Sequence, residues 1–170
     1  VLGIGLGWLA AAITSEAAVR LIVGAVALGF VLRQVLGNPP PATGPRRLSA
    51  WAWGLVTGFT SFVAHAGGPP FQMHVLPLRL APATYAATSV VFFAAVNAIK
   101  VAPYAALGVF EREILLAALW LAPVAAAGGV AGAWVARRMA PAVFYPLVHA
   151  LLAVVGAKLV WDGMVGLAQG

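Results

Sequence analysis

The feature that most constrains the fold is a break inside the apolar segment 48–80. Residues 65–70 read His-Ala-Gly-Gly-Pro-Pro, so two glycines and two prolines stand next to one another. Glycine weakens a helix interior and proline removes a backbone hydrogen bond, so one continuous helix should not run through this point. Because an unpaired backbone group costs several kcal/mol in hydrocarbon, we expect protein or a polar cavity to cover the break.

Composition indicates that the surroundings are a lipid bilayer. The chain is 63% hydrophobic and 8% charged, with a mean hydropathy of +0.99, whereas soluble domains carry about 25% charged residues. Four of the apolar runs fit a helical span of about 20 residues. We therefore expect an all-α, polytopic membrane protein with apolar runs at 1–13, 17–36, 48–80, 84–107, 114–136 and 143–165.

Several function classes are excluded. The formal charge of +6 comes from scattered basic residues rather than one stripe, which argues against nucleic-acid binding. Cysteine is absent, so the chain has no disulfide, thiol nucleophile or cysteine metal site. The apolar runs hold no acid pair at helix spacing, and the chain has no zinc-type histidine pair, Walker glycine loop or nucleophile elbow. We expect neither an enzyme nor a protein with a metal or cofactor.

The length of segment 48–80 predicts a re-entrant hairpin. As one helix its 33 residues would extend roughly 50 Å, against a hydrocarbon core of about 30 Å. With a hairpin, six arginines fall on one side of the membrane, and all four acidic residues fall on the other. The positive-inside rule favours this arrangement, with the basic side cytoplasmic. Those arginines are Arg33, Arg46, Arg47, Arg79, Arg137 and Arg138.

A weak internal repeat supports an inverted-repeat transporter fold. A shift of 125 residues places Gly3 on Gly128 and Gly7 on Gly132, and the two copies cross in opposite directions. The first residue already lies in an apolar run, so we expect an N-terminally truncated chain whose first repeat is mostly missing. The domains are then residues 1–36, the last one and a half spans of that repeat; 37–47, a cytoplasmic loop; and 48–170, the second repeat, with hairpin 48–80 and three spans.

The break is also the candidate substrate path, formed in this segment by His65, Gly67, Gly68, Pro69, Pro70 and Gln72. The two prolines suit the first turn of a new helix. The free N–H groups of residues 71–76 would then face the two glycines at the positive end of the helix dipole, which predicts a small oxyanion as ligand. His65 and Gln72 flank the break, and either could donate to that anion or cap the freed backbone.

The span 84–107 carries the other candidate path residues, Thr88, Asn97, Lys100 and Tyr104. The last three share one helix face by their spacing. Lys100 could attract an anion or extend its side chain to the interface. For other polar groups we expect structural roles. Thr57 and Thr60 should bond to carbonyls of their own helix, and His149 should be packed or interfacial.

The small residues Gly128, Gly129 and Gly132 should likewise serve close helix packing rather than substrate binding.

The run GFTSFVAHAGGPPFQ at residues 58–72 resembles the second-repeat signature of the TauE/SafE sulfite exporter family. The similarity continues through VLP at 75–77, ATS at 87–89, Asn97, Lys100, LGVF at 107–110 and KLVWDG at 158–163. His74 stands where the family pattern has an aromatic such as tyrosine.

The resemblance implies a carrier of the bacterial inner membrane, built from two inverted halves around a path for sulfite or organosulfonates. Gly67, Gly68, Pro69, Pro70, Gln72, Asn97 and Lys100 match the motifs that would line this path. The implied partners are a small anionic substrate, the lipid bilayer and the missing N-terminal half. A channel-like anion pore and a non-transporting membrane scaffold are the alternatives.

Overall fold

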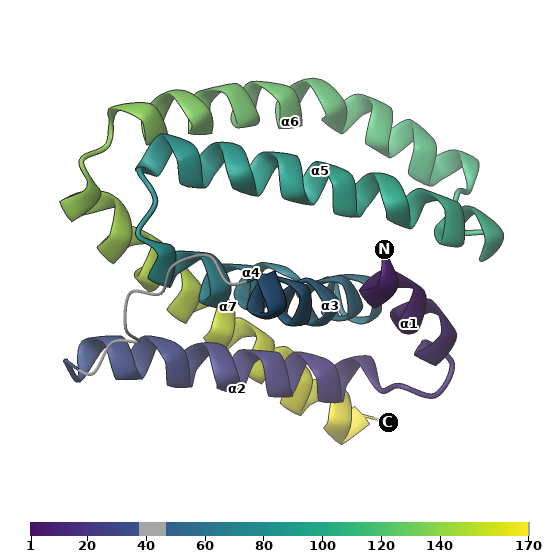
Figure 1. The fold of residues 1–170 in the computed structure, drawn as a ribbon. Coiled ribbons are helices and arrows are strands. Elements are labelled where there is room, and N and C mark those ends of the chain that lie inside the picture. The colour runs from purple at the N-terminus through teal and green to yellow at the C-terminus, as the bar shows by residue number, and fades with distance from the viewer. Residues whose placement is uncertain (38–46, 170) are drawn as a thin grey trace. The chain divides into compact units, whose positions relative to one another are not determined.

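The fold is entirely helical in the part of the chain that the computed structural model describes, residues 1–37 and 47–169. These residues form no strand, which confirms the predicted all-α class. The loop predicted at 37–47 lies almost wholly outside the described residues. Figure 1 shows the helices α1 (Leu2–Ala10), α2 (Glu16–Val35), α3 (Arg47–Val63), α4 (Gly68–Val75), the 3₁₀ helix η1 (Leu76–Leu78), α5 (Pro82–Ala106), α6 (Arg112–Arg138) and α7 (Pro141–Gln169).

Four helices are long and apolar enough to cross a membrane, namely α2, α5, α6 and α7. They correspond to the four runs that fit a span in the sequence. Large apolar side chains such as Leu119, Trp120 and Val124 are exposed along α6. A surface of this kind suits a bilayer, because a soluble monomer rarely exposes apolar area so extensively. The chain is a multi-pass membrane protein.

The described chain forms two compact units. The first contains residues 1–80 and 145–170, and the second contains residues 81–144. The break and helices α1 to α4 therefore belong to the first unit together with most of α7, whereas α5 and α6 belong to the second.

Glycines let α1 pack directly against α3 in the first unit. A Cβ built on Gly3 would lie 2.2 Å from the carbonyl oxygen of Leu55, and one on Gly58 would lie 3.1 Å from the amide nitrogen of Ile4. One turn along α1, a Cβ on Gly7 would lie 3.0 Å from the Cβ of Phe62. The two backbones meet at these positions, so any side chain there would force the helices apart.

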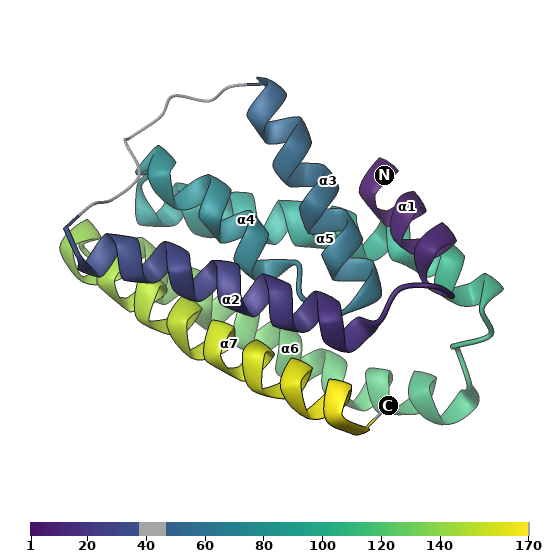
Figure 2. The ribbon, with the colours of Figure 1, turned by 90° about the horizontal axis from the view of Figure 1, so that it is seen from below.

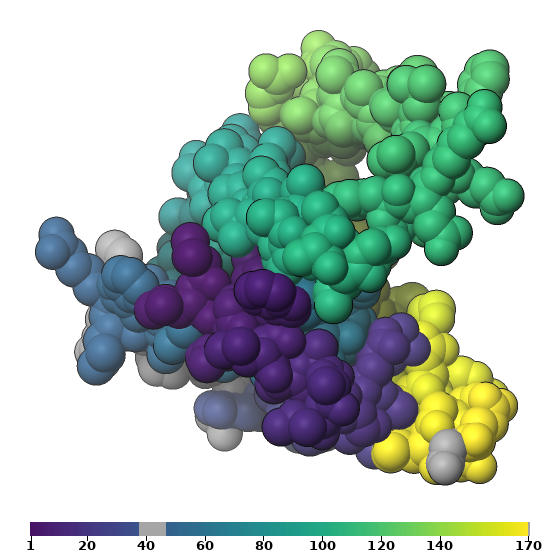
Figure 3. Space-filling view, turned by 90° about the vertical axis from the view of Figure 1, so that its right-hand side faces the viewer, coloured from purple at the N-terminus to yellow at the C-terminus, as the bar shows by residue number. Residues whose placement is uncertain are grey.

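Helices α2 and α7 meet in the same way (Figure 2). A Cβ on Gly24 would lie 2.7 Å from the carbonyl oxygen of Gly156, and one on Gly163 would lie 2.7 Å from the carbonyl oxygen of Ala17. Figure 3 shows the end of α7, in yellow, beside the first turns of α2. Small residues allow such close approach, as they commonly do between membrane helices.

The second unit has an open glycine face, contrary to prediction. No atom of that unit comes within 4 Å of a Cβ built on Gly128, Gly129 or Gly132. The expected close packing of these residues is therefore wrong for the described chain. The physical reason is that α5 meets α6 elsewhere along its surface, so this stripe of α6 has no facing helix among the described residues.

Candidate functional site

The break is formed by a left-handed residue that ends α3. His65 has a φ of 53°, a conformation that histidine tolerates better than most residues. The amides of Ala64 and Ala66 both donate to the carbonyl oxygen of Thr60, each at 3.1 Å. One carbonyl of the last helical turn thus satisfies two N–H groups at the break, which lowers the cost of placing it at membrane depth.

After the break the chain folds back onto α3. A Cβ on Gly67 would lie 2.7 Å from the Cβ of Ser61 and 3.1 Å from the carbonyl oxygen of Thr57, so only glycine fits there. Further along, the ring of His74 in α4 stacks on Trp53 of α3, with centroids 6.5 Å apart. His74 therefore takes a place in the hairpin that another aromatic ring could fill.

The apolar side of the break is covered by protein, as expected. Ala64 and Ala66 are each 3% exposed and form one buried cluster with Val19 and Val23 of α2. Thr60 bonds to the carbonyl oxygens of Val56 and Thr57, at 2.9 and 3.3 Å, which confirms its predicted role. Pro70 lines an apolar pocket between α2, α3 and α4 rather than a polar one.

The first turn of α4 offers fewer donors than the sequence suggested. Pro69 and Pro70 do occupy that turn, as predicted, but they carry no N–H. The amide of Phe71 donates to the carbonyl oxygen of Gly67 at 3.3 Å, so the expectation that it stays free is wrong. The reason is that Phe71 is the fourth residue after Gly67 and already closes a helical turn. Donors toward the break are left to Gly67 and Gly68.

Gln72 has a vacant hydrogen-bonding position. Its Oε1 atom is buried and has no hydrogen-bond partner among the described residues. Burying such a group unpaired costs about 1–3 kcal/mol. The amide oxygen and nitrogen can exchange places, so this position could accept or donate. Oε1 does not cap the break, which leaves it available for a ligand. His65 is exposed at the tip of the break.

The candidate residues of the second unit lie along α5. Lys100 is 6% exposed, and its Nζ lies 5.7 Å from the centroid of the Tyr104 ring, so these two share a face as predicted. Asn97 and Thr88 are exposed. Burial of Lys100 disagrees with a side chain that extends to the interface, because such a lysine would expose its ammonium group.

The structure thus gathers the candidates into two groups. His65, Gly67, Gly68, Pro69, Pro70 and Gln72 surround the break in the first unit, and Thr88, Asn97, Lys100 and Tyr104 follow one helix in the second. That both groups line one path remains a prediction.

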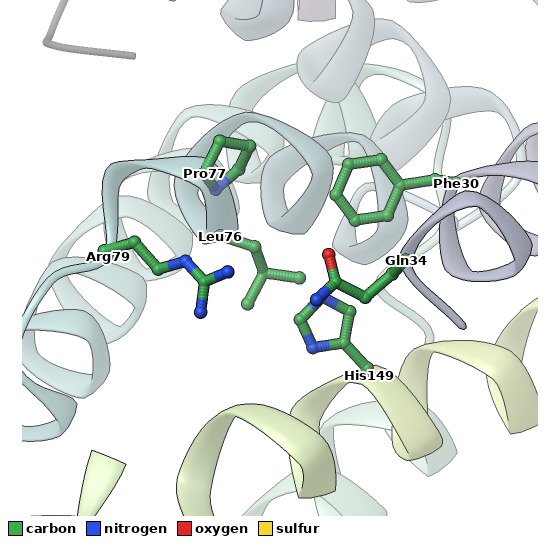
Figure 4. Close-up of a pocket in the computed structure, with 6 residues that line it drawn as sticks. All are labelled: Phe30, Gln34, Leu76, Pro77, Arg79 and His149. Carbon is green, nitrogen blue, oxygen red and sulfur yellow. The ribbon is translucent and has the colours of Figure 1, made fainter. Parts of the chain in front are cut away.

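A polar pocket that sequence reasoning missed lies in the first unit (Figure 4). It is lined by Phe30, Gln34, Leu76, Pro77, Arg79 and His149. His149 is packed, as expected, since its ring stacks on Phe30 with centroids 6.2 Å apart. Nothing local in the sequence predicts that His149 and Arg79 line one pocket, because 70 residues separate them and only the fold brings α7 to this place.

Comparison with known proteins gives a match to one family model. No curated protein and no solved structure matches the chain. The family model described as "Sulfite exporter TauE/SafE" matches residues 1–159, which includes the break, α5, α6 and most of α7. The chain belongs to the TauE/SafE sulfite exporter family, a family of membrane transporters.

Proposed function

We propose that this chain is part of a secondary carrier that moves small sulfur oxyanions, such as sulfite or organosulfonates, across the bacterial inner membrane. The observation that carries the proposal is the vacant buried position of Gln72 beside a helix break. A membrane protein that keeps a buried polar atom unpaired sacrifices stability. A ligand that fills the position explains why the cost is tolerated.

The charges favour an anion over a cation. The break and its flanking helices, residues 47–80, contain no acidic residue that could neutralise a cation. In the first unit, Glu16 already pairs with Arg20, and Asp162 already pairs with Lys158. Lys100, buried in α5, adds a positive group to the second set of candidates. A buried ammonium is best stabilised by an opposite charge.

The geometry of the first unit supports a re-entrant hairpin. Gln34 in the last turn of α2 and Arg79 at the end of η1 line one pocket. Only residues 36–46 separate α2 from α3. The hairpin therefore ends beside the last turn of α2, the turn that also carries Arg33. By the positive-inside rule this side faces the cytoplasm.

The test is transport by the full protein in liposomes. Uptake of radiolabelled sulfite, thiosulfate and a small sulfonate should be saturable and should depend on a counter-ion. Absence of flux for every sulfur oxyanion would overturn the proposal. Currents linear in voltage would identify a pore instead. Loss of expression, rather than loss of transport, in Asn97→Ala and Lys100→Gln would identify a scaffold.

A further inference from the structure

The pocket between α2, η1 and α7 brings together three polar side chains from distant parts of the chain. Gln34 comes from the last turn of α2, Arg79 follows η1, and His149 lies in the first half of α7. Figure 4 shows all three side chains pointing into one space, with Phe30, Leu76 and Pro77 forming its apolar wall. The pocket lies wholly within the first unit.

Arg79 brings a positive charge that no acidic side chain neutralises in the described part of its unit. The two acidic residues of this unit pair elsewhere, Glu16 with Arg20 and Asp162 with Lys158. The guanidinium carbon of Arg79 instead lies 5.3 Å from the centroid of the Tyr145 ring. A cation–π contact occupies one face of the guanidinium and leaves its N–H edge for a planar or tetrahedral oxyanion.

The backbone holds Arg79 in place. Its φ is 51°, and its amide donates to the carbonyl oxygen of Leu76 at 3.2 Å. The next carbonyl oxygen, that of Leu80, accepts a hydrogen bond of 2.6 Å from the Tyr145 hydroxyl. The left-handed conformation of a non-glycine residue costs about 1–2 kcal/mol. Contacts on both sides therefore fix the direction of the Arg79 side chain.

His149 is oriented with equal precision. Its Nδ1 lies 2.7 Å from the carbonyl oxygen of Tyr145, and a carbonyl can only accept, so Nδ1 carries the hydrogen. Stacking on Phe30 fixes the plane of the ring. Nε2 is then the ring atom that remains for a ligand, and as the acceptor nitrogen it can receive the O–H of a hydrogen-bearing oxyanion such as hydrogensulfite. The Gln34 amide supplies a further donor.

We propose that Gln34, Arg79 and His149 form a second binding site, for a small oxyanion group, separate from the break. The site lies at the end of the unit where α2 finishes, so an anion that approaches from this side meets it before the break. The anion is the transported sulfur oxyanion; its identity, though not the existence of the site, rests on the proposed function. A phospholipid headgroup presents the same oxyanion chemistry and is the other possible source.

The experiment measures equilibrium binding of radiolabelled sulfite to the full protein in nanodiscs of phosphatidylcholine alone. Arg79→Gln should weaken binding about tenfold, the loss expected when one charge-assisted hydrogen bond is removed. The matched control is Arg33→Gln, which removes the same charge one residue from Gln34 but on an exposed side chain outside the pocket. It should change the affinity less than twofold.

A second variant guards against misfolding. His149→Phe keeps a ring to stack on Phe30 and removes the ligand atom, so it should also weaken sulfite binding while the far-ultraviolet circular dichroism stays unchanged. Adding phosphatidylglycerol distinguishes the two sources. If a headgroup fills the site, this lipid should compete with sulfite in the wild type but not in Arg79→Gln. If the free anion fills it, the lipid should have no effect.

The proposed site would be wrong if Arg79→Gln and Arg33→Gln bound sulfite with the same affinity and responded in the same way to phosphatidylglycerol. This result is distinguishable from failure of the proposed function. If only the site is wrong, the wild-type protein still transports sulfur oxyanions, and Arg79→Gln transports them with unchanged KM. If the proposed function is wrong, the wild type transports none of them, and inorganic sulfate then replaces sulfite as the probe of the pocket.

Discussion

Helices α1 and α6 carry glycines at matching places, but only those of α1 are packed. Gly3 and Gly7 bring α1 into backbone contact with α3. Gly128 and Gly132, 125 residues later, face no atom of their own unit within 4 Å. The shift that relates the two pairs is the one that suggested an internal repeat. The two glycine pairs occupy matching sequence positions, but one pair is packed against a helix and the other is open.

The difference shows that a glycine stripe does not by itself determine packing. In the first unit, the hairpin helix α3 fills the glycine face of α1. The matching stripe of α6 stays open among the described residues, and a helix surface of small residues allows another helix to approach closely.

The largest effect is expected from filling the packed face. Gly3→Val places a side chain where even a Cβ is 2.2 Å from the carbonyl oxygen of Leu55. The backbones must separate, so the free energy of unfolding should fall by about 3 kcal/mol. Thermal unfolding in detergent measures it. Gly5→Ala is the matched control, because a Cβ there meets nothing within 4 Å; a similar loss in this control would contradict the packing argument.

The hairpin offers a second pair of neighbouring glycines. Gly67→Ala puts a Cβ 2.7 Å from that of Ser61 and should cost about 2 kcal/mol of stability, since α4 must move away from α3. Gly68→Ala meets no atom within 4 Å and should cost little. Chemical denaturation of both variants in the same detergent compares them. Equal losses would mean that the hairpin does not close as the structure shows.

The open face of α6 should respond in the opposite direction. Gly128→Ala should stabilise this chain by about 1 kcal/mol, because alanine favours helix and nothing obstructs its side chain. Thermal unfolding of this variant in detergent measures the change. A destabilisation similar to that of Gly3→Val would contradict an open face at this position.

The smallest effect concerns the tip of the break. His65→Gly removes the strain of a left-handed residue, which amounts to about 1 kcal/mol and is partly cancelled by the greater freedom of glycine when unfolded. Stability should therefore stay within about 0.5 kcal/mol of the wild type. His65→Val should destabilise, because β-branched residues avoid this region. Stabilisation by valine, measured by denaturation, would show that the left-handed conformation is not held in the native protein.

The helical class, the four spans and the break followed from sequence because each depends on local chemistry. Apolar length determines a span, and two prolines after two glycines determine where a helix restarts. The predicted free amide of Phe71 is wrong, because this amide makes the first helical hydrogen bond after the prolines, to the carbonyl oxygen of Gly67. The pocket that Arg79 and His149 line together could not be foreseen, since it depends on how α7 packs in the first unit. The same holds for the unpaired Gln72 amide, which only the packing of neighbouring side chains reveals.

The most direct test of the oxyanion path is the initial rate of sulfite uptake into liposomes that contain the full protein with Gln72→Met. Methionine preserves the volume and removes the hydrogen-bonding atoms, and Gln169→Met, at the exposed end of α7, is the matched control. The account predicts a fall of about tenfold for Gln72→Met, the loss of one hydrogen bond to a charged group, and no change for the control. Equal rates in the two variants would contradict it.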